Sequence, residues 1–276
     1  PDGGGLGVRR TALSAALHEV ARAQGANVMP GTLVRSVTRQ HDRVVVRTDD
    51  RELEAAILVG ADGLHSRVRR EAGLEGSPQP IRRFGMRRHV RVPPWSDDVE
   101  VHFTDGVEAY VTPCGPDRVG IAFLFEHGRV PPRVRFELLL ACFPRLSQRL
   151  AGAEFESETR GLGSLWHQPR ARVVDRLVLL GDAAGYIDAL TGEGVSLALQ
   201  GAEALATVLP DAMARGGDRL AFLPFERACD QLWRRYALLT RSMLALARRP
   251  MLRRAVVRGL ARHPATFNRL VAAALG

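Results

Sequence analysis

The feature of the sequence that most restricts its fold is a hydrophobic segment that leads through a glycine-rich turn into a helix. Residues Val173–Leu180 have the apolar, β-branched composition of a strand buried on both faces of a parallel sheet. The turn Gly181–Gly185 (GDAAG) follows, and then Thr191–Val195 (TGEGV) precedes a helix that we predict over residues 194–209. A buried strand joined to a helix in this way is the building unit of α/β proteins, so we predict an α/β fold.

This strand–turn–helix segment also has the composition of a ligand site. Asp182 would lie at the end of the strand, where its carboxylate can accept hydrogen bonds from a ligand. The first backbone N–H groups of the helix have no partner within it, and its positive dipole end favours anionic or electron-rich atoms. The small side chains of Ala183, Ala184, Ala198 and Ala202 would let the helix pack closely against the sheet and a ligand. An ordinary strand–helix unit without a ligand is the alternative.

A second segment of the same kind begins at Gly60, after a short apolar strand predicted over Ala55–Val59. Asp62 stands at the end of this strand and can accept hydrogen bonds from ligand hydroxyls, while Gly63 allows a tight turn. Ser66 can cap the helix that follows. The arginines of this helix would lie near the mouth of the site as donors to an anion, namely Arg67, Arg69 and Arg70. The alternative is a strand–turn–helix corner in which the serine only caps the helix.

Two further elements precede these segments. We predict a helix over Arg10–Gln24 because apolar residues recur there at helical spacing. The residues of this stripe are Leu13, Leu17, Val20 and Ala21. A β-hairpin is predicted from Leu33–Thr38 and Arg43–Thr48, which alternate or are β-branched.

The middle of the chain has a strand-rich pattern. Four strand-like segments, at 84–92, 99–103, 108–112 and 119–125, are separated by turns that contain proline or glycine. We predict an antiparallel sheet inserted here, followed by a helix over 133–151, and later helices over 219–247 and 251–275. The predicted division of the chain is therefore one domain in two parts, residues 1–78 and 166–225, an inserted domain at 79–165, and C-terminal helices at 226–276.

The basic residues limit both the chemistry and the partners. All 39 are arginine, which excludes a lysine Schiff base and a P-loop lysine. The net charge is +9, and residues 227–276 carry 11 arginines with a single acid, Asp230. This basic tail could face a membrane surface, a nucleic acid or an acidic carrier protein; the alternative is a solvated helix face.

Several protein classes are excluded by what the sequence lacks. No apolar run approaches the roughly 20 residues of a transmembrane helix, and we expect no signal peptide in the first residues. The cysteines Cys114, Cys142 and Cys229 are far apart, which excludes a disulfide framework and favours a reducing compartment. We find no HExxH or GxSxG pattern, so we expect neither a metal site nor a hydrolase triad.

Together, the two strand–turn segments resemble those of the class A flavoprotein monooxygenases and geranylgeranyl-reductase-like enzymes. Asp62–Arg69 is similar to the DG motif of that family, and Gly181–Ala198 is similar to its more specific GD motif. The helix at Arg10 is similar to the one that precedes the adenine-side hairpin of the family. The resemblance covers roughly residues 7–209. It implies a Rossmann-type parallel sheet that binds FAD, with an inserted antiparallel substrate sheet and C-terminal helices.

The resemblance assigns candidate cofactor residues in the GD motif. Gly181 opens the motif, and Asp182 would bind the ribityl hydroxyls of FAD. Gly192, Gly194 and Val195 would direct backbone N–H groups at the pyrimidine edge of the isoalloxazine or at the pyrophosphate. Such donors would stabilise negative charge on the reduced flavin.

The remaining assignments concern the other parts of the site. Asp62 would lie beside the pyrophosphate and ribose of FAD, and Arg10 would reach the flavin from the pyrophosphate side. In the family the Asp62 segment also assists NAD(P)H, which we expect as the electron donor. The inserted sheet would roof the isoalloxazine and hold a small hydrophobic organic substrate. We assign no catalytic residue, and the candidates in the insert are His89, His102, Glu108, Tyr110 and Cys114.

The sequence departs from the family pattern in three ways. It has no GxGxxG unit for the ADP half of FAD, and since the family places this unit upstream of the Arg10 helix, we expect an N-terminal truncation of about 90–100 residues. Binding of FAD by this chain alone therefore stays open. Gly185 and Ala189 replace the His and Pro of many hydroxylases, which favours the reductase and halogenase side of the family. The tryptophan-rich signature of the halogenases is absent.

Two functions remain open from the sequence. The first is an FAD-dependent oxidoreductase, fuelled by NAD(P)H, that acts as a monooxygenase or reductase on a hydrophobic organic substrate. The second is a basic helical binding module that uses residues 227–276, with flavin function lost by truncation. We favour the first, as a cytoplasmic enzyme without a nucleic-acid partner and with at most a peripheral contact between residues 227–276 and a membrane or carrier protein. The sequence does not determine the substrate or the oligomeric state.

Overall fold

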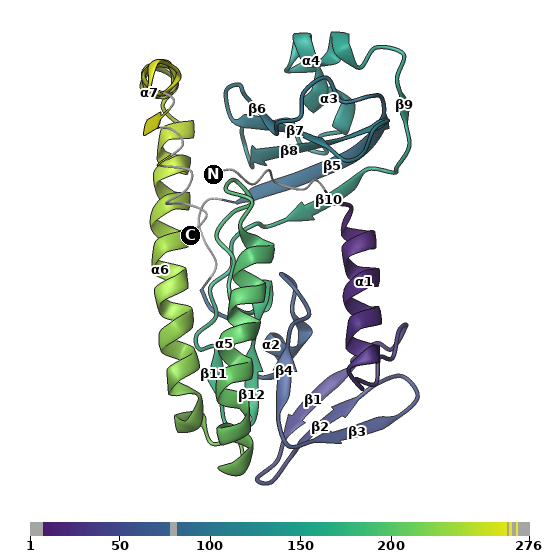
Figure 1. Cartoon of the computed structure of the whole chain (residues 1–276), viewed down its shortest axis with the longest axis vertical. Coiled ribbons are helices and arrows are strands. Elements are labelled where there is room, and N and C mark those ends of the chain that lie inside the picture. Colours follow the sequence, from purple (N-terminus) through teal and green to yellow (C-terminus); the bar gives the residue numbers. More distant parts are fainter. Residues whose placement is uncertain (1–7, 78–81, 264, 267–268, 270–276) are drawn as a thin grey trace. The chain divides into compact units, whose positions relative to one another are not determined.

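The computed structural model describes residues 8–77, 82–263, 265–266 and 269 (Figure 1). By its internal contacts the chain divides into two compact units. The first unit is drawn from within residues 1–30, 81–164 and 245–276, and the second from 31–80 and 165–244. Each unit therefore combines segments that are far apart in the sequence. The predicted division into four consecutive segments stays a prediction.

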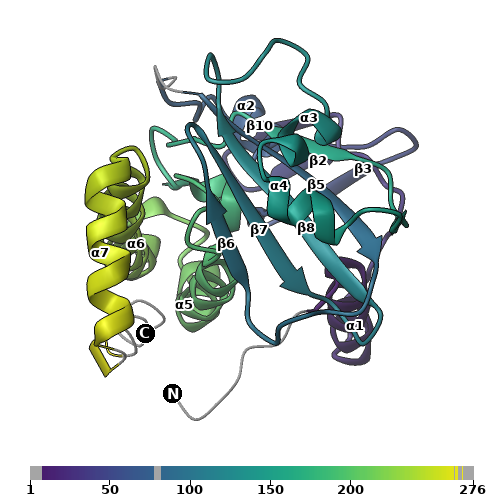
Figure 2. The ribbon, with the colours of Figure 1, turned by 90° about the horizontal axis from the view of Figure 1, so that it is seen from above.

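The first unit is built on an antiparallel sheet, as predicted for the insert. Its strands lie in the order β10-β5-β8-β7-β6, with β9 pairing with β5 (Figure 2). The strands are β5 (Arg83–Arg91), β6 (Glu100–Phe103), β7 (Val107–Pro113), β8 (Arg118–Glu126), β9 (Glu154–Phe155) and β10 (Arg160–Gly163). The four strand-like segments of the sequence correspond to β5, β6, β7 and β8, so this part of the prediction is confirmed.

One face of this sheet is covered by two short helices, α3 (Phe136–Ala141) and α4 (Pro144–Arg149). The ring of Phe123 on β8 lies 4.9 Å from that of Phe136, edge to face, and 5.9 Å from that of Phe143. The single helix predicted over 133–151 is wrong. Pro144 lacks a backbone N–H and its ring clashes with the preceding turn, so it can only begin a new helix.

Two helices of the first unit are mostly exposed. The helix predicted at Arg10 is confirmed as α1 (Arg10–Ala23), yet none of its residues is buried, and Leu17 and Val20 are 48% and 60% exposed. Helix α7 (Pro250–Arg262) begins close to where the sequence predicts it, and much of its predicted extension to 275 lies outside the described residues. The guanidinium of Arg253 stands 4.8 Å above the ring of Phe103 on β6.

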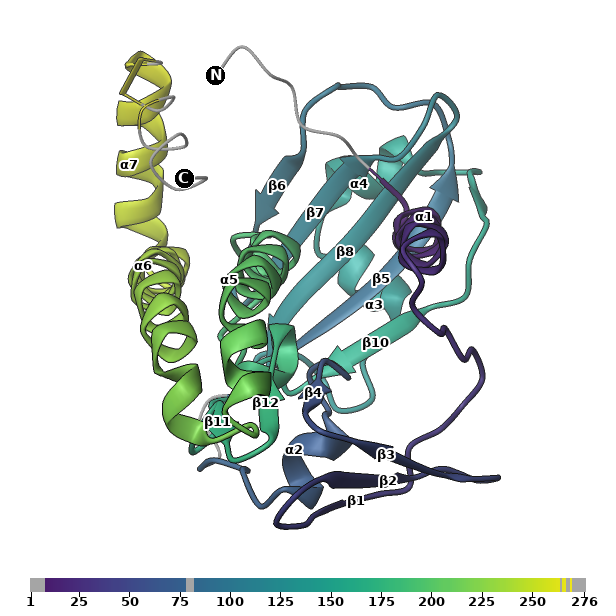
Figure 3. The ribbon, with the colours of Figure 1, turned by 60° about the horizontal axis from the view of Figure 1, so that its bottom comes forward.

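The second unit contains two small sheets (Figure 3). The predicted hairpin is confirmed as β1 (Ser36–Arg39) and β2 (Val44–Arg47), and β3 (Glu52–Ala55) extends it. In the other sheet, β12 (Leu177–Leu179) pairs in parallel with β4 (Leu58–Gly60) and antiparallel with β11 (Val173–Val174).

Two predicted strands of this unit need correction. The segment 173–180 is not one strand, because the chain turns at Arg176, which has a φ of +63°. Asp175 stabilises this turn by accepting a hydrogen bond from the backbone N–H of Arg219 at 2.9 Å. The segment 55–59 is likewise divided, since Ala55 ends β3 and Leu58 begins β4.

Helices cover both faces of the β11-β12-β4 sheet. The helical elements of this unit are α2 (Arg67–Glu71), α5 (Gly194–Ala214) and α6 (Leu223–Ala247), with short 3₁₀ turns at η1 (Gly181–Ala184) and η2 (Arg219–Phe222). Val173 and Val178 pack against α5 and α6, whereas Leu177 and Leu179 pack towards α2 and the hairpin. A parallel pair buried on both faces confirms the predicted α/β class. Within the described ranges, no helix combines the length and hydrophobicity needed to cross a membrane.

Candidate functional site

The two predicted ligand segments meet at one edge of the β11-β12-β4 sheet. Strands β4 and β12 run in parallel, with Gly60 paired to Leu179 at their ends. Asp62 follows the first of these strands within two residues, and Asp182 follows the second within three. Open α/β sheets bind their ligands outside the carboxyl ends of parallel strands, so both acids stand at the edge where a ligand is expected.

The turn after β12, residues 181–194, will be called the GD loop. Its conformation requires glycine, because Gly181 and Gly185 have φ angles of +59° and +143°. A side chain at Gly185 would place its Cβ 2.3 Å from the Trp233 ring, so α6 lies against this part of the loop. The opposite end of the loop is open. No atom lies within 4 Å of the position that a Cβ would take at Gly192, and Val195 is exposed.

The start of α5, at the open end of the GD loop, presents unsatisfied polar groups. Glu193 occupies the N-cap position but makes no side-chain hydrogen bond to the helix, and the first turn contains no acid. The buried Oγ1 of Thr191 and Oε2 of Glu193 have no hydrogen-bond partner among the described residues. Burial raises the pKa of Glu193, and the nearby Thr191 hydroxyl partly offsets this. The first backbone N–H groups of this 21-residue helix therefore lie next to a carboxyl group whose pKa is raised by burial.

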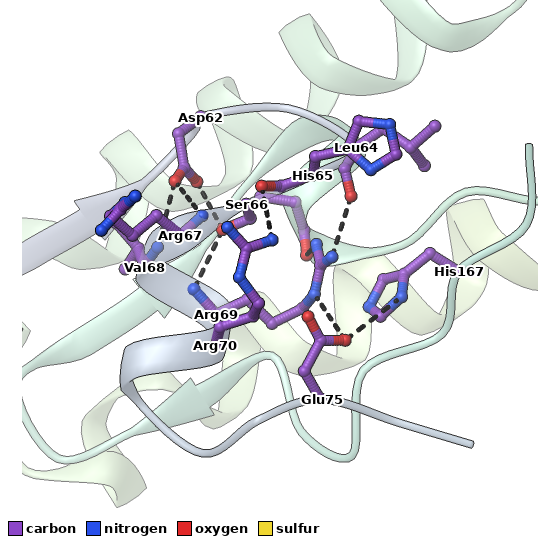
Figure 4. Close-up of polar contacts among 11 residues, drawn as sticks. Asp62, Leu64, His65, Ser66, Arg67, Val68, Arg69, Arg70, Glu75 and His167 are labelled. Atoms are coloured by element: carbon purple, nitrogen blue, oxygen red, sulfur yellow. Dashed lines mark hydrogen bonds and ion pairs between the residues drawn. The ribbon is translucent and has the colours of Figure 1, made fainter. Parts of the chain in front are cut away.

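Asp62 is held in a network that caps α2 (Figure 4). Its Oδ2 accepts hydrogen bonds from the backbone N–H groups of Arg67 at 2.7 Å and Val68 at 3.0 Å, and its Oδ1 accepts one from the Ser66 hydroxyl. Ser66 in turn accepts a bond from the N–H of Arg69 at 2.9 Å, which confirms its predicted capping role. A ligand hydroxyl at Asp62 would share a carboxylate that already accepts three hydrogen bonds.

Arg69 joins the α2 segment to the GD loop. Its side chain is buried and donates to the carbonyl oxygens of Leu64 at 2.8 Å and Ala183 at 3.2 Å, while its Nε lies 3.3 Å from a carboxylate oxygen of Glu75. The prediction that Arg69 is an anion donor at the mouth is therefore wrong, because its guanidinium is engaged inside the protein. The contact with Ala183 spans 114 positions of sequence, and no local pattern could have indicated it.

His167 is a site residue that the sequence analysis missed. Its Nδ1 faces Glu75 at 3.6 Å, and its backbone exchanges two hydrogen bonds with Tyr186 of the GD loop, of 2.7 and 2.8 Å. Burial, assisted by the charge of Arg69 and opposed by Glu75, lowers the pKa of His167 to about 4. The imidazole is therefore neutral at physiological pH.

The other candidate residues lie in the first unit. Arg10 opens α1, and its predicted contact with a flavin stays a prediction. Glu108 pairs with Arg83 at 2.6 Å inside the sheet, where both side chains are buried. His89 and Cys114 both have atoms within 4 Å of the position that a Cβ would take at Gly120. His102 faces the helix-covered side of the sheet, with its ring 6.4 Å from that of Phe143. Tyr110 lies on β7, opposite Val101 of β6 and Ala122 of β8.

Comparison with known proteins assigns most of this chain to one family model. Residues 6–221 match the model described as FAD binding domain. The chain is 31% identical over 200 residues to dialkyldecalin synthase of Streptomyces rugosporus, covering 67% of this chain and 42% of that protein. It is 27% identical over 234 residues to the chloroplastic geranylgeranyl diphosphate reductase of Oryza sativa, covering 76% and 48%. The chain thus spans about half the length of these curated relatives.

A similar fold occurs among solved structures. The flavin-dependent halogenase CmlS aligns with a TM-score of 0.74 at 23% identity, over 83% of this chain and 45% of that protein. At this identity the likeness concerns the fold alone. The names of the three relatives describe a synthase, a reductase and a halogenase, so what they share is an architecture on which different reactions occur.

Proposed function

The chain belongs to the FAD binding domain family, and from that premise we propose that it supplies the flavin-facing half of the FAD site in an oxidoreductase. The observation that carries this proposal is the GD loop, in which an acid at a strand end, an uncapped helix start and two unsatisfied buried oxygens come together. These groups fit a ligand edge that combines hydroxyls with hydrogen-bond acceptors and donors, as FAD does.

Five residues of the GD loop and the start of α5 have a role in this proposal. Asp182 accepts hydrogen bonds from the ribityl hydroxyls, and Gly181 gives the turn that brings its carboxylate to the sheet edge. Gly192, Gly194 and Val195 offer backbone N–H donors to the pyrimidine edge or the pyrophosphate. Bound FAD would supply the electron-transfer chemistry, and these donors, at the positive end of α5, would stabilise negative charge at the ring edge.

The proposal also includes the outer parts of the site. Asp62 stands at the same sheet edge as Asp182, which supports its place beside the pyrophosphate and ribose, and Arg10 belongs to the proposal by motif position alone. NAD(P)H remains the proposed electron donor. A hydrophobic organic substrate is supported by a relative whose name gives geranylgeranyl diphosphate. The proposal covers either a monooxygenase or a reductase reaction, and it includes a peripheral contact of residues 227–276 with a membrane or carrier protein.

Flavin binding by matched variants tests this proposal. FAD is titrated into the purified chain and its affinity measured by flavin fluorescence for wild type, Asp182→Asn and the control Asp211→Asn, an exposed acid farther along α5. Asp182→Asn should weaken FAD binding about 10- to 100-fold, because hydrogen bonds to charged groups contribute about 1.5–3 kcal/mol. The control Asp211→Asn should bind FAD with the affinity of the wild type. Absence of flavin binding at any concentration, or equal affinity in all three proteins, would overturn it.

A further inference from the structure

The second unit contains a cleft whose lining includes none of the residues assigned to the flavin. It has a volume of about 240 Å³ and lies between the segment before β11 and helix α6. Its lining combines two tryptophans, a histidine and three arginines, namely Trp166, His167, Arg172, Trp233, Arg234 and Arg241. Such a mixture of flat apolar rings and cationic groups is suited to a ligand that is both planar and anionic.

The cleft carries uncompensated positive charge. Arg172 pairs with Asp230 at 2.7 Å, whereas Arg234 and Arg241 make no hydrogen bond or ion pair within the described part of the chain. The two free arginines lie seven positions apart on α6, two helical turns, and therefore on the same face. An anion with two charges would neutralise them and relieve their mutual repulsion.

His167 adds an acceptor to the cleft. Its ring is neutral and its Nδ1 faces Glu75, which favours a proton on that nitrogen (Figure 4). Nε2 is then a bare lone pair, and it is buried without a hydrogen-bond partner among the described residues. A buried acceptor left unpaired is costly, and a ligand hydroxyl would satisfy it once the imidazole turns to present Nε2 to the cleft.

The tryptophans provide flat surfaces for a ring. The guanidinium of Arg172 already stands 5.2 Å above the Trp233 ring and fixes that side chain at the cleft wall. Trp166 lines the cleft beside His167. Base–aromatic stacking contributes about 1–3 kcal/mol per base in protein–nucleotide contacts.

We propose that this cleft binds a nucleotide, with the phosphates at Arg234 and Arg241, a sugar hydroxyl donating to Nε2 of His167, and the base against Trp166. The three requirements are met by one ligand class, because a nucleotide carries an anion, hydroxyl donors and a planar ring in one molecule. This site goes beyond the proposed flavin site and does not depend on it.

Calorimetric titration with ADP tests the proposal, with adenosine and pyrophosphate as its two halves. ADP should bind at least tenfold more tightly than either half, and it should change the fluorescence of the wild type but much less that of Trp166→Phe. Pyrophosphate binding as tightly as ADP would reduce the cleft to a general anion site and overturn the nucleotide assignment. Absence of ADP binding would also overturn it.

Paired variants of α6 locate the binding. Arg234→Gln combined with Arg241→Gln should weaken ADP at least tenfold, whereas Arg235→Gln, an exposed neighbour outside the cleft lining, should stay within twofold of wild type. Unchanged ADP affinity in the double variant would refute the site. Asp182→Asn should leave ADP binding intact, so failure of the flavin proposal and failure of this one are separate results.

Discussion

Acidification should weaken the second unit through His167. In the folded chain, burial and the charge of Arg69 hold the pKa of this imidazole at about 4, against 6.5 for an exposed histidine. Between these values the unfolded chain binds a proton that the folded chain excludes, so stability falls as the pH falls. The contribution of His167 is fully present above pH 6.5 and is lost as the pH drops towards 4.

The size of this effect follows from the two pKa values. At pH 5 the unfolded imidazole is almost fully protonated and the folded one is mostly neutral, which corresponds to about 2 kcal/mol lost relative to pH 8. The side chain is only 12% exposed, so solvent screens little of the repulsion from Arg69. Below pH 4 both states bind the proton and the loss reaches a plateau of about 3 kcal/mol.

Urea denaturation of wild type and His167→Gln at pH 8 and pH 5 measures this loss. Other titrating groups contribute equally to both proteins, so the difference between the two pH-induced changes isolates His167. We expect the variant to lose about 2 kcal/mol less than wild type between these pH values. If both proteins lose the same stability, the imidazole is not desolvated as described and the argument fails.

Two substitutions test the packing around the GD loop, each measured by urea denaturation. Gly185→Ala should lower the free energy of unfolding by at least about 2 kcal/mol, because the new Cβ would lie 2.3 Å from the Trp233 ring and the backbone there has a positive φ. The control Gly259→Ala lies in open space within α7, and it should leave this free energy unchanged or raise it. Arg69→Met should lower the free energy of unfolding by about 3–5 kcal/mol, because it leaves buried carbonyl groups and a carboxylate without their partner. The control Arg70→Met removes an exposed side chain and should lower it by less than about 1 kcal/mol. A small loss at Gly185 or Arg69, equal to that of its control, would contradict the described contacts.

The sequence predicted the local chemistry of the site well. Tight turns after apolar strands need glycine, and the serine ahead of α2 has few other roles than capping, so the loop geometry and the Ser66 cap were readable from neighbouring residues. The antiparallel sheet was equally readable, because its strands alternate and their turns contain proline or glycine. The sequence did not predict that β4 pairs with β12, because this pairing joins two segments that are far apart in the chain.

What the sequence did not predict depends on contacts between distant residues or on backbone strain. Arg69 looks like an exposed cation until the fold buries it against Ala183. His167 has no motif around it, and its low pKa arises only because the fold buries it beside Arg69. The break at Arg176 needs a left-handed residue that is not glycine, which composition does not indicate. Pro144, in contrast, was a readable signal that the helix over 133–151 would divide.

The central claim is that the GD loop holds the flavin. A crystal structure of the protein with FAD tests it most directly. The account predicts the Asp182 carboxylate within about 3.2 Å of a ribityl hydroxyl and the N–H groups of Gly194 and Val195 directed at the flavin. Flavin density away from residues 181–195, or an Asp182 side chain that faces away from the bound cofactor, would contradict it.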